Sequence, residues 1–334
     1  MTTGVPKAVL YYSPVSVWSA VALLAIEEKG YGEDEIDLRV VDLGKGENYD
    51  PTFLRLNPKA TVPTLVVPYE NSLTEGVESR FKALTDTKTI VEFLDKSRSV
   101  ISRTHSTSSA PAPALSPATI GATTSCNAIV DDILHDEVAN PNTLRYVNAR
   151  DEGSLRKLAA DIAPSLRQRQ QALKGYITQA DSGSVHVSDK VKRLWGEKLE
   201  AITVILSVLE DAGKAETELD EERATNRIAF FKTARQAWET NLSGVLTALN
   251  KEMVGPYTLG DQYSIADLHL AGWLARVAKL AGGTSSDDGH TIVKKLEEYI
   301  GGGFKVGEDD KLGVFWDAVR ERKSWQKVYG GGLF

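Results

Sequence analysis

The distribution of apolar residues divides the chain into two parts with different periodicities. In the first part, short strand-like runs alternate with longer runs that carry apolar residues at helical spacing. The strand-like runs lie at 8–12, 36–41 and 64–67, and the helix-like runs lie at 17–28 and 85–96. This alternation is typical of a small mixed sheet with helices packed against it. We therefore predict an α/β domain over residues 1–98.

The second part follows a stretch of Ser, Thr, Ala and Pro at residues 99–125. Because this composition buries little apolar surface, it predicts a poorly ordered linker. Residues 126–334 contain no run with the pattern of a strand, and we predict an all-helical domain there. Its helix-like segments are 127–149, 154–180, 188–213, 221–252, 264–281 and 311–328.

Composition and charge exclude several classes of protein. The chain has 334 residues, enough for two domains, and its net charge of −7 does not suit binding to nucleic acid or anionic lipid. The single cysteine, Cys126, allows no internal disulfide, and the five histidines lack metal-ligand spacing. No apolar run approaches the roughly 18 residues of a membrane span, and the first residues lack a signal-peptide pattern. We therefore expect a cytoplasmic protein with no metal, no nucleic-acid partner and no membrane span.

Ser16 is the first candidate for chemistry. It follows a predicted strand and precedes the first predicted helix, where a helix N-cap belongs. A hydroxyl there lies among free backbone N–H groups at the positive end of the helix dipole, which favours an anion such as a thiolate. An ordinary capping serine gives the same pattern, so Ser16 alone does not establish a site.

Two further features occur in the α/β part. Val62-Pro63 stands at the start of a strand, where proline is tolerated and where a cis bond would present the backbone of the preceding residue to a ligand. Asp86-Thr87 opens the next helix, where side chains and N–H groups could hold the ammonium and carboxylate of an amino acid. Each feature also has a structural explanation, as a loop that enters a strand and as a helix cap.

In this order the three features resemble the thioredoxin-like domain of the cytosolic glutathione transferases. Val62-Pro63 is similar to the cis-proline motif of that family, and Asp86-Thr87 to its usual Glu-Ser pair, with a conservative change at both positions. The resemblance extends over residues 7–98.

The helical part resembles the same family over about residues 255–329. Residues 258–268 are similar to the family's Gly-Asp…Ala-Asp segment, in which Ser264 and Asp267 have the spacing of a capping box. Between these two regions the resemblance is weak. It implies an α/β thioredoxin-like N-terminal domain, an all-α C-terminal domain and a homodimer.

The resemblance also implies roles for individual residues. The Ser16 hydroxyl would donate a hydrogen bond to the sulfur of glutathione, so that the thiol ionises more easily. Tyr12, or its neighbour Tyr11, is the alternative sulfur contact, because other classes of the family use a tyrosine near this position. The remaining glutathione contacts would be Val62 and Pro63 for the cysteinyl part, Asp86 and Thr87 for the γ-glutamyl part, and, on charge and loop position, Lys45 for the glycine carboxylate.

The implied activity is conjugation of the glutathione thiolate to an apolar electrophile, a detoxification reaction. The candidate residues of the electrophile pocket are Val15, Trp18, His135 and Tyr146. The alternative is a glutathione-transferase-like protein that binds ligands or partners with little turnover, because its insertions could cover the pocket.

Two insertions distinguish the chain from the family, at 68–83 between the third and fourth strands and at about 150–225 among the helices. The ganglioside-induced differentiation-associated proteins also carry extra helices in the second of these places. Residues 49–57 are similar to the tetrachlorohydroquinone dehalogenases as well. The dehalogenase cysteine is absent, since Trp18 stands near its position, so reductive dehalogenation is not expected.

Overall fold

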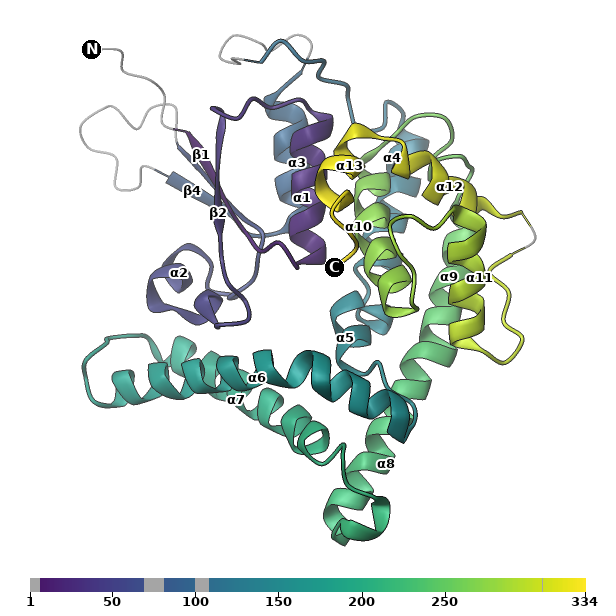
Figure 1. Ribbon diagram of the computed structural model, residues 1–334. Helices are drawn as coiled ribbons and strands as arrows, with labels where there is room; N and C mark the ends of the chain where they lie inside the picture. The colour runs from purple at the N-terminus through teal and green to yellow at the C-terminus, as the bar shows by residue number, and fades with distance from the viewer. Residues whose placement is uncertain (1–6, 69–80, 100–107, 308) are drawn as a thin grey trace. The chain divides into compact units, whose positions relative to one another are not determined.

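The computed structural model describes residues 7–68, 81–99, 108–307 and 309–334. Contacts group the chain into two compact units, which are described separately (Figure 1). The first unit contains Met1–Val40, Thr61–Pro141 and Leu242–Phe334, and the second contains Val41–Ala60 and Asn142–Asn241. The domain boundaries expected at residues 98 and 126 remain predictions beside this grouping. Most of the insertion predicted at 68–83 lies outside the described residues.

The first unit contains a four-stranded mixed sheet with the strand order β2-β1-β3-β4. Its strands are β1 (Ala8–Tyr12), β2 (Ile36–Val40), β3 (Thr64–Pro68) and β4 (Phe81–Leu84). β1 pairs with β2 in parallel and with β3 antiparallel, and β3 pairs with β4 antiparallel. The helices α1 (Val17–Glu28) and α3 (Thr87–Ser97) pack against each other beside this sheet (Figure 1). The predicted combination of a small mixed sheet with helices is confirmed.

The rest of the first unit is helical, and no strand occurs after residue 126 among the described residues. Its helices are α4 (Ile120–Asn127), the π-helix η2 (Ala128–Leu134), the 3-10 helix η3 (Glu137–Ala139), α9 (Leu242–Glu252), α10 (Ile265–Leu280), α11 (Gly289–Ile300), α12 (Lys311–Arg320) and α13 (Lys323–Tyr329). α10 crosses α1 closely at Gly272, where a Cβ atom would lie 2.7 Å from Val21 Cγ2 and 3.2 Å from the Val17 carbonyl oxygen. A side chain at Gly272 would therefore force the two helices apart.

The expectation of a poorly ordered linker is wrong for the part of residues 99–125 that the structure describes beyond residue 107. Ala112 and Leu115 are buried, and α4 already begins at Ile120. The carboxylate of Asp95 on α3 accepts hydrogen bonds from the backbone N–H of Leu115 at 2.9 Å and of Ser116 at 3.0 Å. Long-range polar anchoring thus compensates for the small apolar area of this stretch, which composition alone does not reveal.

The second unit is all helical in its described residues. It contains the 3-10 helices η1 (Glu47–Tyr49) and η4 (Glu216–Glu218), the π-helix η5 (Gln236–Asn241), and the α-helices α2 (Pro51–Leu56), α5 (Pro141–Tyr146, which starts at the boundary of the units), α6 (Glu152–Asp181), α7 (Asp189–Glu210) and α8 (Glu221–Arg235). The long helices α6 and α7 pack against each other and make up most of the predicted insertion at 150–225.

The inserted helices hold the segment Val41–Ala60. Trp195 on α7 is fully buried, its ring stacks on Tyr176 of α6 at 5.5 Å, and its Nε1–H donates to the Tyr49 carbonyl at 3.0 Å. Leu54 of α2 belongs to the same apolar core. The segment that contains α2 is therefore buried against helices that lie more than 90 positions later in the sequence.

Candidate active site

The sheet brings three of the predicted site segments to one edge. In the antiparallel register, Tyr11 of β1 lies opposite Thr64 of β3, and Leu65 of β3 lies opposite Leu84 of β4. The end of β1, the start of β3 and the end of β4 consequently share an edge. Ser16 follows β1, Val62-Pro63 precedes β3 and Asp86-Thr87 follows β4. The three segments that the sequence singles out therefore adjoin the same end of these strands.

Ser16 is the N-cap of α1, as its place in the sequence predicts. Its Oγ accepts a hydrogen bond from the Ser19 N–H at 3.2 Å, and its exposed fraction is 9%. The oxygen is thus used as an acceptor, while the hydroxyl hydrogen stays available for donation. Capping and hydrogen bonding to an anion are compatible at this position, because they use different parts of the same hydroxyl.

The other hydroxyls near Ser16 differ in their surroundings. Ser13 and Ser19 are almost fully buried, and the Ser13 N–H donates to Ser19 Oγ at 3.2 Å. The Tyr11 hydroxyl accepts from Arg39 Nη1 at 3.2 Å. Tyr12 is half-buried and lines an apolar cavity. Among these groups, Tyr12 remains the alternative to Ser16 for contact with a ligand.

Val62 and Pro63 form a cis peptide bond, which confirms that prediction. Both residues are buried. Among the described residues, the Val62 N–H and C=O have no hydrogen-bond partner. An extended peptide could pair with this backbone as an additional strand would.

Asp86 and Thr87 form the start of α3. Asp86 is its N-cap, and Oδ1 accepts from the Thr89 N–H and the Thr89 hydroxyl, both at 2.9 Å. Thr87 is buried, whereas Asp86 is exposed. The first N–H groups of α3 and the exposed carboxylate together present donors and an acceptor to solvent, which suits a zwitterionic amino acid group.

Trp18 and His135, two candidates for the electrophile pocket, are in direct contact in the first unit. Their rings stack at 4.1 Å with an interplanar angle of 20°. His135 Nε2 lies 2.8 Å from Nδ1 of His269 on α10, so the two imidazoles share a hydrogen bond. His269 is fully buried, and its Nε2 has no hydrogen-bond partner among the described residues.

Burial determines the charge of this histidine pair. It lowers the pKa of His269 well below the usual value, and the neighbouring His135 and Lys88 lower it further. Burial also lowers the pKa of His135, against the opposing effect of Asp86 and Asp131. Both rings are therefore neutral at neutral pH. An unpaired Nε2 lone pair costs less than an unpaired N–H, which favours the tautomer of His269 with its proton on Nδ1.

Val15, the third pocket candidate, lies elsewhere in the first unit. It is exposed and lines an apolar cavity of about 530 Å³ together with Tyr12 and the final residues Leu333 and Phe334. Buried Arg276 on α10 joins both walls, because its Nη2 donates to the Val15 carbonyl at 2.6 Å and its Nε to the Phe334 carbonyl at 2.7 Å.

Lys45 and Tyr146 belong to the second unit. Lys45 is 69% exposed and forms an ion pair with Asp42 at 3.3 Å. The Tyr146 hydroxyl accepts from Arg169 Nη1 of α6 at 2.8 Å, and Arg169 Nε donates to the Leu43 carbonyl.

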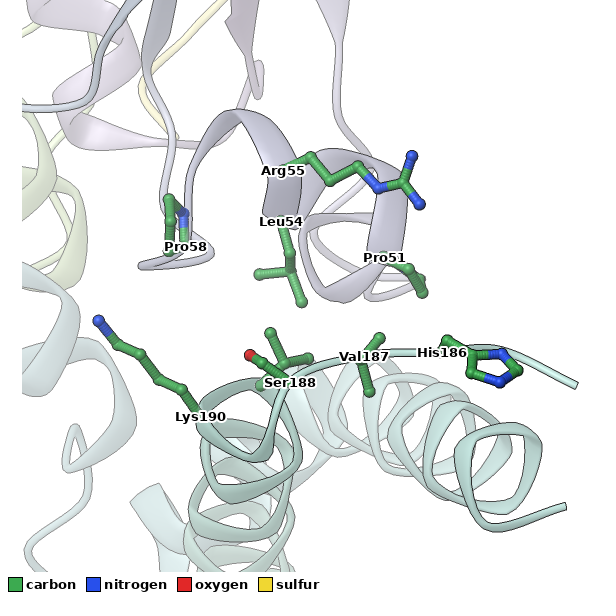
Figure 2. A pocket seen from close by; sticks show the side chains of 9 residues that line it. Pro51, Leu54, Arg55, Pro58, His186, Val187, Ser188 and Lys190 are labelled. Carbon is green, nitrogen blue, oxygen red and sulfur yellow. The ribbon is translucent and has the colours of Figure 1, made fainter. Parts of the chain in front are cut away.

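The second unit also has a cavity of about 360 Å³ that the sequence did not predict. Leu54 of α2 points into it from one side, the segment that contains Val187 and Ser188 lies opposite, and Lys190 lies at one end (Figure 2). None of the predicted site residues lines this cavity.

Sequence reasoning assigned no ligand role to Arg169, Arg276 or His269. Each of these residues contacts a segment more than 120 positions away. Periodicity and short motifs do not contain such pairings, so no local signal could have identified them. The described residues contain no group of three or more His, Cys, Asp or Glu side chains arranged to hold a metal ion.

Comparison with family models identifies both halves of this architecture. The model of the glutathione S-transferase N-terminal domain matches residues 15–97, and the model of the C-terminal domain matches residues 198–300. Together they cover more than half of the chain.

Individual proteins are similar to the chain in sequence or in structure. The tetrachloro-p-hydroquinone reductive dehalogenase of Sphingobium chlorophenolicum is 44% identical over 63 residues, which are 19% of this chain and 24% of that protein. The match therefore spans about a quarter of that relative's length. Among solved structures, the β-etherase LigF from Sphingobium sp. strain SYK-6 has a TM-score of 0.50 at 14% identity, over 97% of this chain and 98% of its own.

A glutathione transferase homologue from sulfitobacter, solved with bound glutathione, has a TM-score of 0.45 at 14% identity over 96% of both chains. The structural likeness to LigF concerns the fold, whereas the two family models match the sequence itself. The chain belongs to the glutathione S-transferase family.

Proposed function

We propose that this protein conjugates the thiolate of glutathione to an apolar electrophilic small molecule. One observation carries the proposal. The hydroxyl of Ser16 stands at the N-terminus of α1, at the sheet edge that also bears the cis Val62-Pro63 bond and the start of α3. Glutathione binding requires a hydrogen-bond donor for the sulfur, an unpaired backbone segment for the cysteinyl part, and groups that bind the ammonium and carboxylate of the γ-glutamyl part.

The role of Ser16 follows from its hydrogen bonding. Because its oxygen already accepts from the Ser19 N–H, its O–H is free to donate to the glutathione sulfur. A hydrogen bond to the ionised form lowers the pKa of a thiol. The thiol proton leaves to solvent, the thiolate forms a carbon–sulfur bond with the electrophile, and the leaving group departs with the bonding electron pair. Holding both substrates together supplies much of the remaining acceleration.

The apolar cavity beside Val15 and Tyr12 supports an apolar second substrate. This cavity is lined by residues of the loop between β1 and α1, so a compound bound in it would lie close to a sulfur held by Ser16. Trp18, His135 and Tyr146 stay proposals as pocket residues.

Reductive chemistry is a second candidate, because a reductive dehalogenase is 44% identical over 63 residues. Chemistry of that kind with a protein thiol needs an accessible thiolate. The single cysteine, Cys126, is buried, and burial raises the pKa of its thiol to about 11. Cys126 is therefore poorly suited to nucleophilic attack, and conjugation fits this chain better.

Calorimetry with glutathione, combined with an assay on a chlorinated nitroaromatic electrophile, tests the proposal. We expect saturable binding and release of chloride as the thioether forms. Absence of glutathione binding would contradict the site. Binding without turnover across several electrophiles would instead favour the alternative, a ligand-binding or partner-binding protein with little turnover.

Assembly and location follow from the family resemblance rather than from the structure. A homodimer in the cytoplasm and a role in detoxification remain predictions. Among the described residues, no helix is long and apolar enough to cross a membrane.

A further inference from the structure

We propose that Arg276, on α10, is a positioning residue for catalysis: it holds the peptide bond that precedes Ser16 and thereby directs the Ser16 hydroxyl toward the glutathione sulfur. The inference rests on the proposed function and deepens it, because it adds a residue on which activation of the thiol depends. Arg276, Val15 and Ser16 all belong to the first unit.

The first argument is the hydrogen bond between Arg276 and the carbonyl of Val15. Nη2 donates to this oxygen at 2.6 Å, and the arginine is only 2% exposed, so the charged donor is largely withdrawn from water. A peptide bond is planar, and the N–H of the same peptide, that of Ser16, donates to the Ser13 carbonyl at 3.0 Å. Both polar groups of this peptide are therefore bonded, which fixes the backbone of Ser16.

The second argument is that side-chain packing does not hold the loop at this point. Pro14 and Val15 are both exposed, Val15 by 48%. A catalytic group must stay within about 0.5 Å of its productive place, and a shift of about 1 Å can cost a hundredfold in rate. The hydrogen bond from Arg276 supplies a restraint that the side chains of Pro14 and Val15 do not.

The third argument is the rigidity of the support. Nε of the same guanidinium donates to the Phe334 carbonyl at 2.7 Å, and the Phe334 ring stacks on that of buried Tyr329 at 4.9 Å. α10 itself is almost entirely buried and packs closely on α1, the helix that Ser16 caps. The Arg276 guanidinium is therefore fixed relative to the helix whose first turn it helps to position.

The shape of the guanidinium suggests the substitution that tests this role. Arginine reaches both carbonyls because its planar fork presents Nε and Nη2 together, whereas lysine keeps the charge but offers a single nitrogen. Arg276→Lys should therefore loosen the loop before Ser16 without removing the positive charge. Arg322→Lys is the matched control, because Arg322 donates to Glu28 at the opposite end of α1 with distances of 2.8 and 2.6 Å.

Titration of the bound thiol provides the first test, because it needs no electrophile. Glutathione at saturating concentration is added to the full chain, to Arg276→Lys and to Arg322→Lys, and the ultraviolet absorbance of the thiolate is followed against pH. We expect the pKa of the bound thiol to be about one unit higher in Arg276→Lys than in the wild type, because a weaker hydrogen bond stabilises the thiolate less. Arg322→Lys should titrate as the wild type does.

Steady-state kinetics give a second readout with the same variants. At neutral pH, kcat for conjugation should fall about tenfold in Arg276→Lys, while KM for glutathione should stay within about threefold of the wild type. The loss should shrink as the pH rises and the thiol ionises without help. In a Ser16→Ala background, Arg276→Lys should cost less than about twofold, because it acts through the hydroxyl that is already absent.

An unchanged titration in Arg276→Lys, or an equal shift in Arg322→Lys, would overturn the inference while leaving the proposed function intact. A full loss from Arg276→Lys in the Ser16→Ala background would overturn it as well. Failure of the wild type to bind glutathione, or a bound thiol that titrates as free glutathione does, would overturn both the inference and the proposed function.

If Arg276→Lys does not fold, Phe334→Ala takes its place. This substitution removes the ring that stacks on Tyr329 and so loosens one of the two carbonyls that fix the guanidinium. The pKa of the bound thiol should then rise by about 0.3 units, which is roughly a twofold lower ratio of thiolate to thiol. An unchanged titration in Phe334→Ala would overturn the inference.

Discussion

At the scale of single residues, the candidate site depends on hydroxyl and imidazole groups whose surroundings give them different properties. Ser16 combines a capping oxygen with a free O–H. Nearby Ser13 and Ser19 are buried, and the Ser13 N–H donates a hydrogen bond to Ser19 Oγ. The sequence places Ser16 at the start of the first helix and favours it as the sulfur contact, but it does not show which of the nearby hydroxyls are buried or hydrogen-bonded. Burial and hydrogen bonding, which depend on the folded structure, make that distinction.

Substitution of Ser16 by alanine tests its role as the donor to sulfur. We expect kcat/KM for conjugation to fall about 10- to 100-fold, because a hydrogen bond to a charged group is lost. Loss of the N-cap should lower the free energy of unfolding by about 1 kcal/mol. Steady-state kinetics and urea unfolding measure the two effects separately.

Two control variants accompany Ser16→Ala. Ser16→Thr keeps both the hydroxyl and the cap and should retain most of the activity. Tyr12→Phe should behave as the wild type. A large loss in Tyr12→Phe, with full activity in Ser16→Ala, would move the sulfur contact to Tyr12.

His269 gives a testable dependence of stability on pH. Its pKa in the folded protein is well below 6.5, so at mildly acidic pH this imidazole binds a proton in the unfolded chain but not in the folded protein. The free energy of unfolding should therefore fall as the pH falls below about 6.5, with a slope of up to about 1.4 kcal/mol per pH unit. His269→Gln should reduce this slope in urea unfolding measured between neutral and mildly acidic pH.

His290→Gln provides the comparison, because His290 is exposed on α11. This variant should keep the slope of the wild type. An equal slope in wild type and His269→Gln would show that other groups, such as His135, account for the effect.

At the scale of elements, periodicity and caps predicted more than composition did. The strands β1, β2 and β3, the helix α1 and the capping box at the start of α10 follow the predicted positions, since local pattern decides them. α11 was missed, although Ile292, Leu296 and Ile300 recur at helical spacing, because glycines flank it on both sides. The linker was misjudged because long-range polar bonds anchor it.

The anchor of the linker is a buried ion pair. Lys29 Nζ lies 2.8 Å from Asp95 Oδ1, and the two side chains are 1% and 6% exposed. Lys29 also donates to the Pro113 carbonyl at 2.6 Å. Asp95→Ala would leave a buried ammonium without its anion and should lower the free energy of unfolding by about 3–5 kcal/mol. Urea unfolding measures this loss.

Glu92→Ala is the control on the same helix. Glu92 pairs with Lys96 at 3.3 Å, and the two side chains are 37% and 70% exposed. Because solvent screens such a pair, its loss should change stability by less than about 1 kcal/mol. Equal effects of the two substitutions would contradict the anchoring role of Asp95.

At the scale of the whole molecule, the sequence predicted the type of architecture but not the grouping of its segments. Residues 41–60 belong to the predicted α/β part, yet they pack with the inserted helices of the second unit. The contact between Arg169 and Leu43 joins residues 126 positions apart. Contacts of this kind depend on which amphipathic faces pack together in the folded structure, and no local sequence pattern specifies that pairing.

Occupancy by glutathione should be visible in the stability of the whole protein. A ligand that binds only the folded state at 100 times its Kd adds about 2.7 kcal/mol to the free energy of unfolding. We expect the midpoint of urea unfolding to rise with glutathione concentration. Glutathione disulfide, which lacks the free thiol, should raise it less if Ser16 contacts the sulfur.

A crystal structure of the protein with glutathione tests the central claim most directly. The account predicts an extended ligand whose cysteinyl backbone pairs with Val62 and whose sulfur lies within about 3.5 Å of Ser16 Oγ. A sulfur in contact with the Tyr12 hydroxyl, or glutathione bound away from the edge formed by β1, β3 and β4, would contradict it.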